Sequence, residues 1–164
     1  MTNIMYMKTQ ITLNVNGKNR DIQVDPKTPL LYVLRNHLQL NGPKYGCGQE
    51  ICGSCMVLID DHAVPCCLLR VDSVVGRTIT TIEGLADEHG TLHPVQQAFV
   101  QEQAAQCGYC LNGMIISAVS LLRQNQIQDE EMVKMLLHRN LCRCGTHTRI
   151  LKAIRSVADM LETN

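Results

Sequence analysis

The chain has 164 residues, enough for one domain or two small ones with a buried core. Fifteen Lys and Arg residues balance fifteen Asp and Glu residues, so the net charge is zero and no basic surface for nucleic acid is expected. The first ten residues lack the apolar segment of a secretory signal, and no segment is long enough for a membrane span. Nine cysteines, an odd number, then favour metal ligation in a reducing cytoplasm over a disulfide framework.

The first half of the chain predicts a small sheet. Residues 10–15 alternate apolar and polar side chains, as a half-buried strand does. Asn16 and Gly17 follow, a strong signal for a type I′ hairpin turn, because both central positions of that turn need positive φ. Further strands are expected at 20–24, 56–59, 63–69 and 78–82, with a turn at 60–62.

One helix is expected before the cysteine-rich loop. Thr28 is the predicted N-cap and Pro29 the predicted first residue, and the helix should end near Leu38. Its apolar residues at 30, 33, 34 and 38 share one side, so the helix should pack on the sheet. A hairpin, a helix and further strands over a cysteine loop form a β-grasp arrangement.

The most informative segment is the glycine-rich loop at residues 45–55. Cys47, Cys52 and Cys55 have the Cys-x4-Cys-x2-Cys spacing of plant-type 2Fe–2S ferredoxins, whose fourth cysteine comes from later in the chain. Glycines at 46, 48 and 53 let the backbone approach the sulfides and turn its N–H groups toward sulfur. A zinc site fits less well, because zinc usually binds two separate Cys-x2–4-Cys pairs.

The spacing leaves the fourth ligand open, since Cys66 and Cys67 are both available. Adjacent side chains point to opposite faces of a strand, so only one of the two could face the cluster. The other thiol is expected to be a small buried apolar residue.

The second half of the chain has helical periodicity beyond a breaker-rich connection at residues 83–91. Four helices with short connections predict a small bundle. The fold class is therefore α+β, with a β-grasp ferredoxin-like domain at residues 1–82 and a four-helix-bundle domain at 83–164. The helices are expected at 93–103, 112–123, 129–138 and 148–161, with His93-Pro94, Asp129 and Thr148 at the starts of three of them.

Two more cysteine pairs lie at breaks between these helices. Cys107 and Cys110 precede the second helix, and Cys142 and Cys144 precede the fourth. Helix N-termini favour anionic thiolates, so the four thiols are expected to hold a second cluster, with a four-Cys zinc site as the alternative. His147 is a weaker candidate ligand, because four thiols already complete the site. The other histidines are expected to be surface or helix-end groups.

Three motifs in this order resemble the small iron–sulfur subunit of molybdenum hydroxylases, the relatives of xanthine dehydrogenase, carbon monoxide dehydrogenase and aldehyde oxidoreductase. They are Gly46-Cys47-Gly48 with Ile51-Cys52-Gly53-Ser54-Cys55, Gln106-Cys107-Gly108-Tyr109-Cys110, and Asn140-Leu141-Cys142-Arg143-Cys144. The resemblance implies one 2Fe–2S cluster in each half, with the fourth thiol of the first just before a leucine, as in Cys67-Leu68. The implied ligands are Cys47, Cys52, Cys55 and Cys67 in the first half and Cys107, Cys110, Cys142 and Cys144 in the second.

The same resemblance implies a function in electron transfer. Electrons pass from the molybdenum–pterin cofactor of a large partner subunit to the helical-half cluster, then to the ferredoxin-like cluster, then to a flavin subunit, a cytochrome or another acceptor. Gln106 and Cys144 match the positions that approach the pterin. The chain is expected to be an oxidoreductase subunit with no catalytic residue of its own.

Departures from the family pattern indicate the subfamily. Cys66 stands where members often have Ser, Asp60-Asp61 where they often have Asp-Gly, and Gly145-Thr146-His147 where many have Thr-Gly-Tyr. With residues 41–45 and 92–99, the last variant resembles small subunits of the nicotinate dehydrogenase and isoquinoline oxidoreductase type. This predicts hydroxylation of an N-heteroaromatic such as nicotinate, with an aldehyde oxidoreductase as the alternative. A free-standing ferredoxin-like carrier and a zinc-stabilised interaction module are the remaining alternatives.

Overall fold

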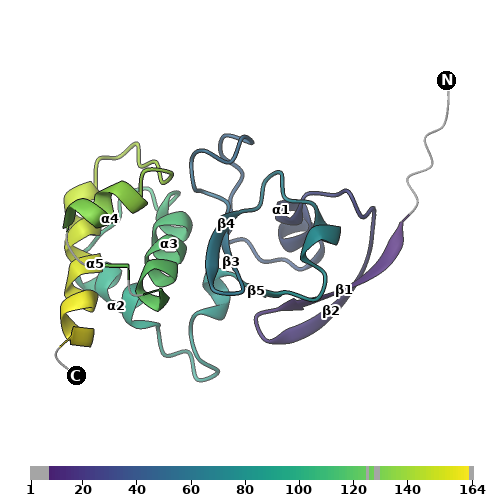
Figure 1. Ribbon diagram of the computed structural model, residues 1–164, viewed down its shortest axis with the longest axis horizontal. Helices are drawn as coiled ribbons and strands as arrows, with labels where there is room; N and C mark the ends of the chain where they lie inside the picture. The colour runs from purple at the N-terminus through teal and green to yellow at the C-terminus, as the bar shows by residue number, and fades with distance from the viewer. Residues whose placement is uncertain (1–7, 125, 128–129, 163–164) are drawn as a thin grey trace.

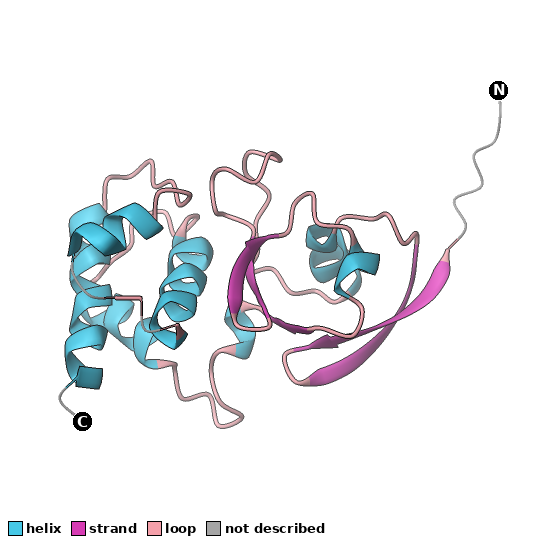
Figure 2. Cartoon of the chain, viewed as in Figure 1, coloured by secondary structure: helices cyan, strands magenta, loops and turns pink. Residues whose placement is uncertain are grey.

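A computed structural model describes residues 8–124, 126–127 and 130–162 of the chain. A five-stranded sheet with one short helix forms the N-terminal half, and four helices form the C-terminal half beside it (Figures 1 and 2). The fold is α+β, as predicted. No helix within the described ranges combines the length and the apolar character that crossing a bilayer requires.

The sheet begins with the predicted hairpin. β1 (Thr9–Val15) pairs antiparallel with β2 (Lys18–Val24). Asn16 and Gly17 have φ values of 52° and 72°, as a type I′ turn requires. The strand order is β2-β1-β5-β3-β4, with β1 and β5 parallel; the remaining strands are β3 (Met56–Ile59), β4 (His62–Pro65) and β5 (Thr78–Thr80).

β3 is the strand on which the two halves meet, because all four of its residues are buried. Val57 and Ile59 pack into the core of the N-terminal half, whereas Met56 and Leu58 pack into the helical core. A strand that is covered on both faces has a continuous apolar sequence, as this one does. The predicted domain division between residues 82 and 83 stays a prediction, and the helical core extends across it into the sheet.

The helical half has the four predicted helices. α3 lies against β3 and β4 on one side and against α2 and α5 on the other (Figure 1). His93 caps α2: its Nδ1 accepts a hydrogen bond from the Val95 N–H at 3.2 Å, so it is a helix-end group, as expected. The helices are α2 (Pro94–Gln101), α3 (Leu111–Arg123), α4 (Glu130–Leu136) and α5 (His147–Glu162). The predicted cap Asp129 lies outside the described residues.

Two predicted helix caps are wrong. The first helix consists of α1 (Leu30–Tyr32) and a π-helical turn at Val33–His37, and Thr28 makes no side-chain capping bond to it. Backbone carbonyls of the segment after β4 satisfy its first N–H groups instead: Leu30 N donates to Leu69 O at 2.7 Å, and Leu31 N to Cys66 O at 3.0 Å. Thr148 lies inside α5 rather than before it.

The predicted strand at 63–69 is also too long, because β4 ends at Pro65. Cys66 and Cys67 therefore follow the strand, and the prediction that they point to opposite faces of a strand is wrong. The Cys66 N–H still donates to Cys55 O at 3.3 Å, in register with β3, but the Cys66 carbonyl turns to accept from Leu31 N at the start of α1. The 3₁₀ helices Val71–Val74 and Ile82–Gly84 were not predicted, and the second takes the end of the strand expected at 78–82.

Replacing Leu58 with alanine should lower the free energy of unfolding by about 2–5 kcal/mol, because the change leaves a cavity where the two halves meet. Leu58 is completely buried. Leu92→Ala removes the same atoms at a position that is 41% exposed, and it should cost about 0.5 kcal/mol or less. Urea denaturation followed by circular dichroism measures both. Equal losses in the two variants would contradict the central position of β3.

Candidate iron–sulfur sites

The loop at residues 45–55 turns backbone N–H groups toward its own thiols. The Cys47 N–H donates to Cys52 Sγ at 3.3 Å, and the Gln49 and Ile51 N–H groups donate to Cys47 Sγ at 3.3 and 3.4 Å. Burial raises the pKa of Cys47, but these N–H groups and the Cys52 thiol outweigh it and lower the pKa to about 7. The loop is thus built to hold thiolate sulfur.

At two positions of this loop, Gly46 and Gly53, the neighbouring atoms leave no space for a Cβ. A Cβ on Gly46 would lie 2.7 Å from Cys52 Sγ, which is closer than real contacts allow. A Cβ on Gly53 would lie 2.6 Å from the Arg139 carbonyl oxygen, and the φ of Gly53 is 77°. The prediction that glycines let the backbone close on the sulfurs is consistent with this geometry.

Cys55 contacts both Cys66 and Cys67, and all three are buried. Hydrogen bonds from the Cys66 thiol and then from the Cys67 thiol outweigh burial and lower the pKa of Cys55 to about 6. Burial, reinforced by the neighbouring Cys55 thiol, raises the pKa of Cys67 to about 11. Cys66 also donates to the Cys55 carbonyl oxygen at 2.9 Å, so its thiol proton has a partner within the protein.

The structure brings the four remaining cysteines together beside the starts of α3 and α5, where Cys110 is the N-cap of α3. The Tyr109 N–H and then the Cys144 thiol lower the pKa of Cys107. Burial raises the pKa of Cys142, but the Thr146 hydroxyl at 3.3 Å, the Thr146 N–H and the Cys110 thiol lower it to about 6. Burial and the bond to Cys142 raise the pKa of Cys110 to about 12.

The predicted ligands thus meet as four pairs of thiols. The pairs are Cys47 with Cys52, Cys55 with Cys67, Cys107 with Cys144, and Cys110 with Cys142, and Cys55 also contacts Cys66. Among the described residues, no three His, Cys, Asp or Glu side chains converge as a single metal ion would need. A 2Fe–2S cluster takes two protein ligands on each of two irons, so paired thiols with inward N–H groups fit that group.

The helical site opens onto the surface. Gln106 and Cys107 are exposed, and Tyr109 and Leu141 beside them are 48% and 60% exposed. Cys144 is half-buried at the same site, and the weaker candidate His147 is exposed at the start of α5. Large apolar side chains exposed next to a functional site are typical of a surface that another protein covers.

Sequence reasoning missed the polar residues that hold the cysteine segments. Thr146 and Asn112 are buried, and Thr146 contacts the Cys142 thiol directly. Asn112 donates to the Ser54 and Met56 carbonyl oxygens at 3.1 and 2.9 Å. The available signal was an asparagine at the start of an otherwise apolar helix, because a polar residue at such a position needs a partner.

Comparison with known proteins identifies the family. Residues 13–90 match the family described as "2Fe-2S iron-sulfur cluster binding domain", and residues 81–155 match the "[2Fe-2S] binding domain" family. A nicotinate dehydrogenase subunit from Pseudomonas putida is 52% identical over 93% of this chain and 97% of its own length. The alpha subunit of isoquinoline 1-oxidoreductase from Brevundimonas diminuta is 42% identical over 88% of this chain and 94% of its own. The chain belongs to the small iron–sulfur subunits of the molybdenum hydroxylases.

A solved structure shows the same fold within a longer polypeptide. The aldehyde oxidoreductase of Desulfovibrio gigas superposes with a TM-score of 0.87 at 38% identity, covering 94% of this chain and 17% of that one. The predicted family, α+β fold and membership in an oxidoreductase are confirmed. The two matched domain families favour iron–sulfur binding over the zinc alternatives.

Replacing Gly46 with alanine should lower the iron bound by the chain, because the new Cβ would press on Cys52 Sγ at 2.7 Å. Gln49→Ala lies in the same loop and changes an exposed side chain, so its iron content should match the wild type. Iron and acid-labile sulfide are measured after reconstitution of both variants. Full iron content in Gly46→Ala would show that the loop has room that the structure does not provide.

Proposed function

We propose that the chain holds two 2Fe–2S clusters and relays electrons between them. The observation that carries the proposal is the meeting of eight thiols in four pairs, two in each half. When bound, such clusters supply one-electron transfer. The proposed ligands are Cys47, Cys52, Cys55 and Cys67 for the N-terminal cluster and Cys107, Cys110, Cys142 and Cys144 for the helical cluster.

In this proposal the partner is a large subunit that holds the molybdenum–pterin cofactor. The exposed apolar residues Tyr109 and Leu141 support a covering partner at the helical site. Gln106 and Cys144 are the residues proposed to lie near the pterin, since Gln106 precedes Cys107 in the chain and the Cys144 thiol contacts Cys107. A longer polypeptide that contains this fold as 17% of its length also supports a large partner.

Electrons therefore enter at the helical site and leave at the loop of residues 45–55. The N-terminal loop is the proposed exit because Tyr45 and Ile51 on it are exposed, which leaves room for an acceptor to approach. The acceptor is a flavin subunit or a cytochrome. A free-standing ferredoxin-like carrier would have no use for the helical site.

The reducing cytoplasm expected from the cysteines stays a prediction.

The proposed substrate is an N-heteroaromatic such as nicotinate. Its support is the 52% identity to the nicotinate dehydrogenase subunit from Pseudomonas putida across 97% of that protein. A second candidate is an aldehyde, which the structural likeness to the aldehyde oxidoreductase of Desulfovibrio gigas favours. No residue of this chain is assigned a catalytic role toward either substrate.

Replacing Cys52 with serine should remove or alter one of two EPR signals in the reduced protein and leave the other, because the proposed ligand sets do not overlap. Cys110→Ser should do the reverse. Cys66→Ser is the control and should keep both signals, since Cys66 is not a proposed ligand. Loss of both signals from one folded ligand variant, or loss of one from the control, would contradict the ligand assignment.

Capture of the native complex through this chain should recover a large polypeptide that contains molybdenum and a pterin. With an artificial dye acceptor, the complex should oxidise nicotinate, and isoquinoline and a panel of aldehydes are tested beside it. Oxidation of aldehydes alone would overturn the proposed substrate and keep the electron relay. Recovery of the chain as a monomer that has activity on its own would overturn the role in a larger complex.

A further inference from the structure

The helical half binds the outward side of the N-terminal cysteine loop. Five backbone carbonyls between residues 45 and 56 accept hydrogen bonds from the helical half. The N–H groups of the loop thus point inward to sulfur, while these carbonyls point outward to the helical half. The donors are Tyr109 Oη to Tyr45 O, Arg139 Nη2 to Glu50 O at 2.7 Å, Leu141 N to Cys52 O at 3.0 Å, and Asn112 Nδ2 to both Ser54 O and Met56 O.

Arg139 acts on a peptide unit that contacts a proposed ligand. The Glu50 carbonyl and the Ile51 N–H belong to the same trans peptide, so they point in opposite directions. Arg139 holds that carbonyl outward, and the N–H faces inward to Cys47 Sγ at 3.4 Å. Glu50 has a φ of 60°, a conformation unfavourable for a residue with a side chain, so the peptide needs such an outside contact.

Asn112 acts in the same way on the backbone around Cys55. Its side chain is only 2% exposed, and its amide donates to the carbonyls of Ser54 and Met56, the residues on either side of Cys55. The next residue, Gly113, lies against the loop as well: a Cβ there would meet Gly53 O at 2.2 Å. The start of α3 is thus fixed against the loop at backbone contact distance.

We propose that Arg139 and Asn112 are positioning residues for the N-terminal cluster, although both belong to the helical half. This inference rests on the proposed ligands. Hydrogen bonds to the sulfurs help to set the potential of an iron–sulfur cluster. Without Arg139, the peptide at 50–51 is free to turn and the Ile51 N–H leaves Cys47; without Asn112, the backbone on both sides of Cys55 is released. The N-terminal cluster then becomes harder to reduce and loses iron more readily.

The test uses the full chain in its native complex, with a redox titration followed by EPR. Arg139→Met and Asn112→Leu should each lower the potential of the N-terminal signal, which Cys52→Ser identifies, and leave the helical signal unchanged. Iron release to a chelator from the N-terminal cluster should be severalfold faster. Arg139→Lys keeps a cationic donor and should restore much of the wild-type potential. Arg139→Met removes a positive charge, whereas Asn112→Leu leaves the charge unchanged. A lower N-terminal potential in both variants would therefore result from the lost orientation of the backbone and not from the lost charge.

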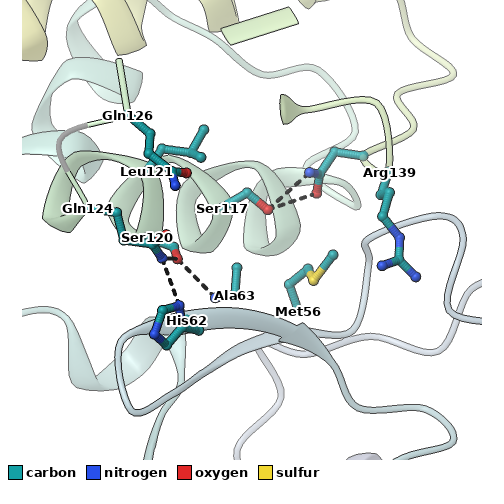
Figure 3. Close-up of a pocket in the computed structure, with 10 residues that line it drawn as sticks. Met56, His62, Ala63, Ser117, Ser120, Leu121, Gln124, Gln126 and Arg139 are labelled. Atoms are coloured by element: carbon teal, nitrogen blue, oxygen red, sulfur yellow. Dashed lines mark hydrogen bonds between the residues drawn. The ribbon is translucent and has the colours of Figure 1, made fainter. Parts of the chain in front are cut away.

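Ser120→Ala is the matched control. Ser120 also lies on α3 and bonds across the halves: it accepts from the Ala63 N–H at 2.9 Å (Figure 3), and it donates to Asp61 O at 3.0 Å. It borders a cavity of about 240 Å³ between α3 and the sheet, and Arg139 stands at the other end of the same cavity. The control should move neither signal.

Two results would overturn the inference. One is an N-terminal signal with an unchanged potential in Arg139→Met. Arg139 is exposed, so this variant should fold even if the buried change Asn112→Leu prevents folding. The other is an equal shift of both signals, which indicates general loosening of the chain. A wild-type protein without two signals would instead overturn the proposed function, so the two failures are distinguishable.

Discussion

Direct backbone contact between the start of α3 and the N-terminal cysteine loop is the constraint on which the arrangement of both sites depends. Gly113 has no side chain, and only this lets the helix approach the Gly53 carbonyl so closely. Gly53 in turn leaves room for the segment at Arg139 and Asn140, which leads to Cys142. Two cysteine sets that are far apart in the sequence therefore lie side by side, joined by the Leu141 N–H and the Cys52 carbonyl at 3.0 Å.

The pKa shifts within the thiol pairs bear on how metal ligation depends on pH. In two pairs one pKa is lowered and the other raised: Cys55 with Cys67, and Cys142 with Cys110. Each such pair holds one proton between two sulfurs. Ligation requires both thiolates, so cluster binding releases that proton and becomes more favourable as the pH rises. The surrounding N–H groups and the Thr146 hydroxyl would then donate hydrogen bonds to the ligating sulfurs and stabilise their negative charge.

Local signals in the sequence predicted much of the fold and the cysteine sets. The Asn16-Gly17 turn, the apolar run at 56–59 and the His93-Pro94 helix start each specify their own structure within a few residues. Features that depend on distant partners were not predictable. Cys66 and Cys67 leave the sheet because the N–H groups at the start of α1 bind carbonyls in their segment. The contacts of Asn112 and Arg139 with the loop join residues that periodicity and spacing cannot relate.

The decisive measurement for two clusters in one chain is iron and sulfide analysis combined with EPR of the fully reduced protein. The paired thiols predict about four iron and four acid-labile sulfide per chain. They also predict two distinct EPR signals, from two clusters that are reduced at different potentials. About two iron per chain with a single signal, or a colourless protein that contains zinc, would contradict the relay between the two halves.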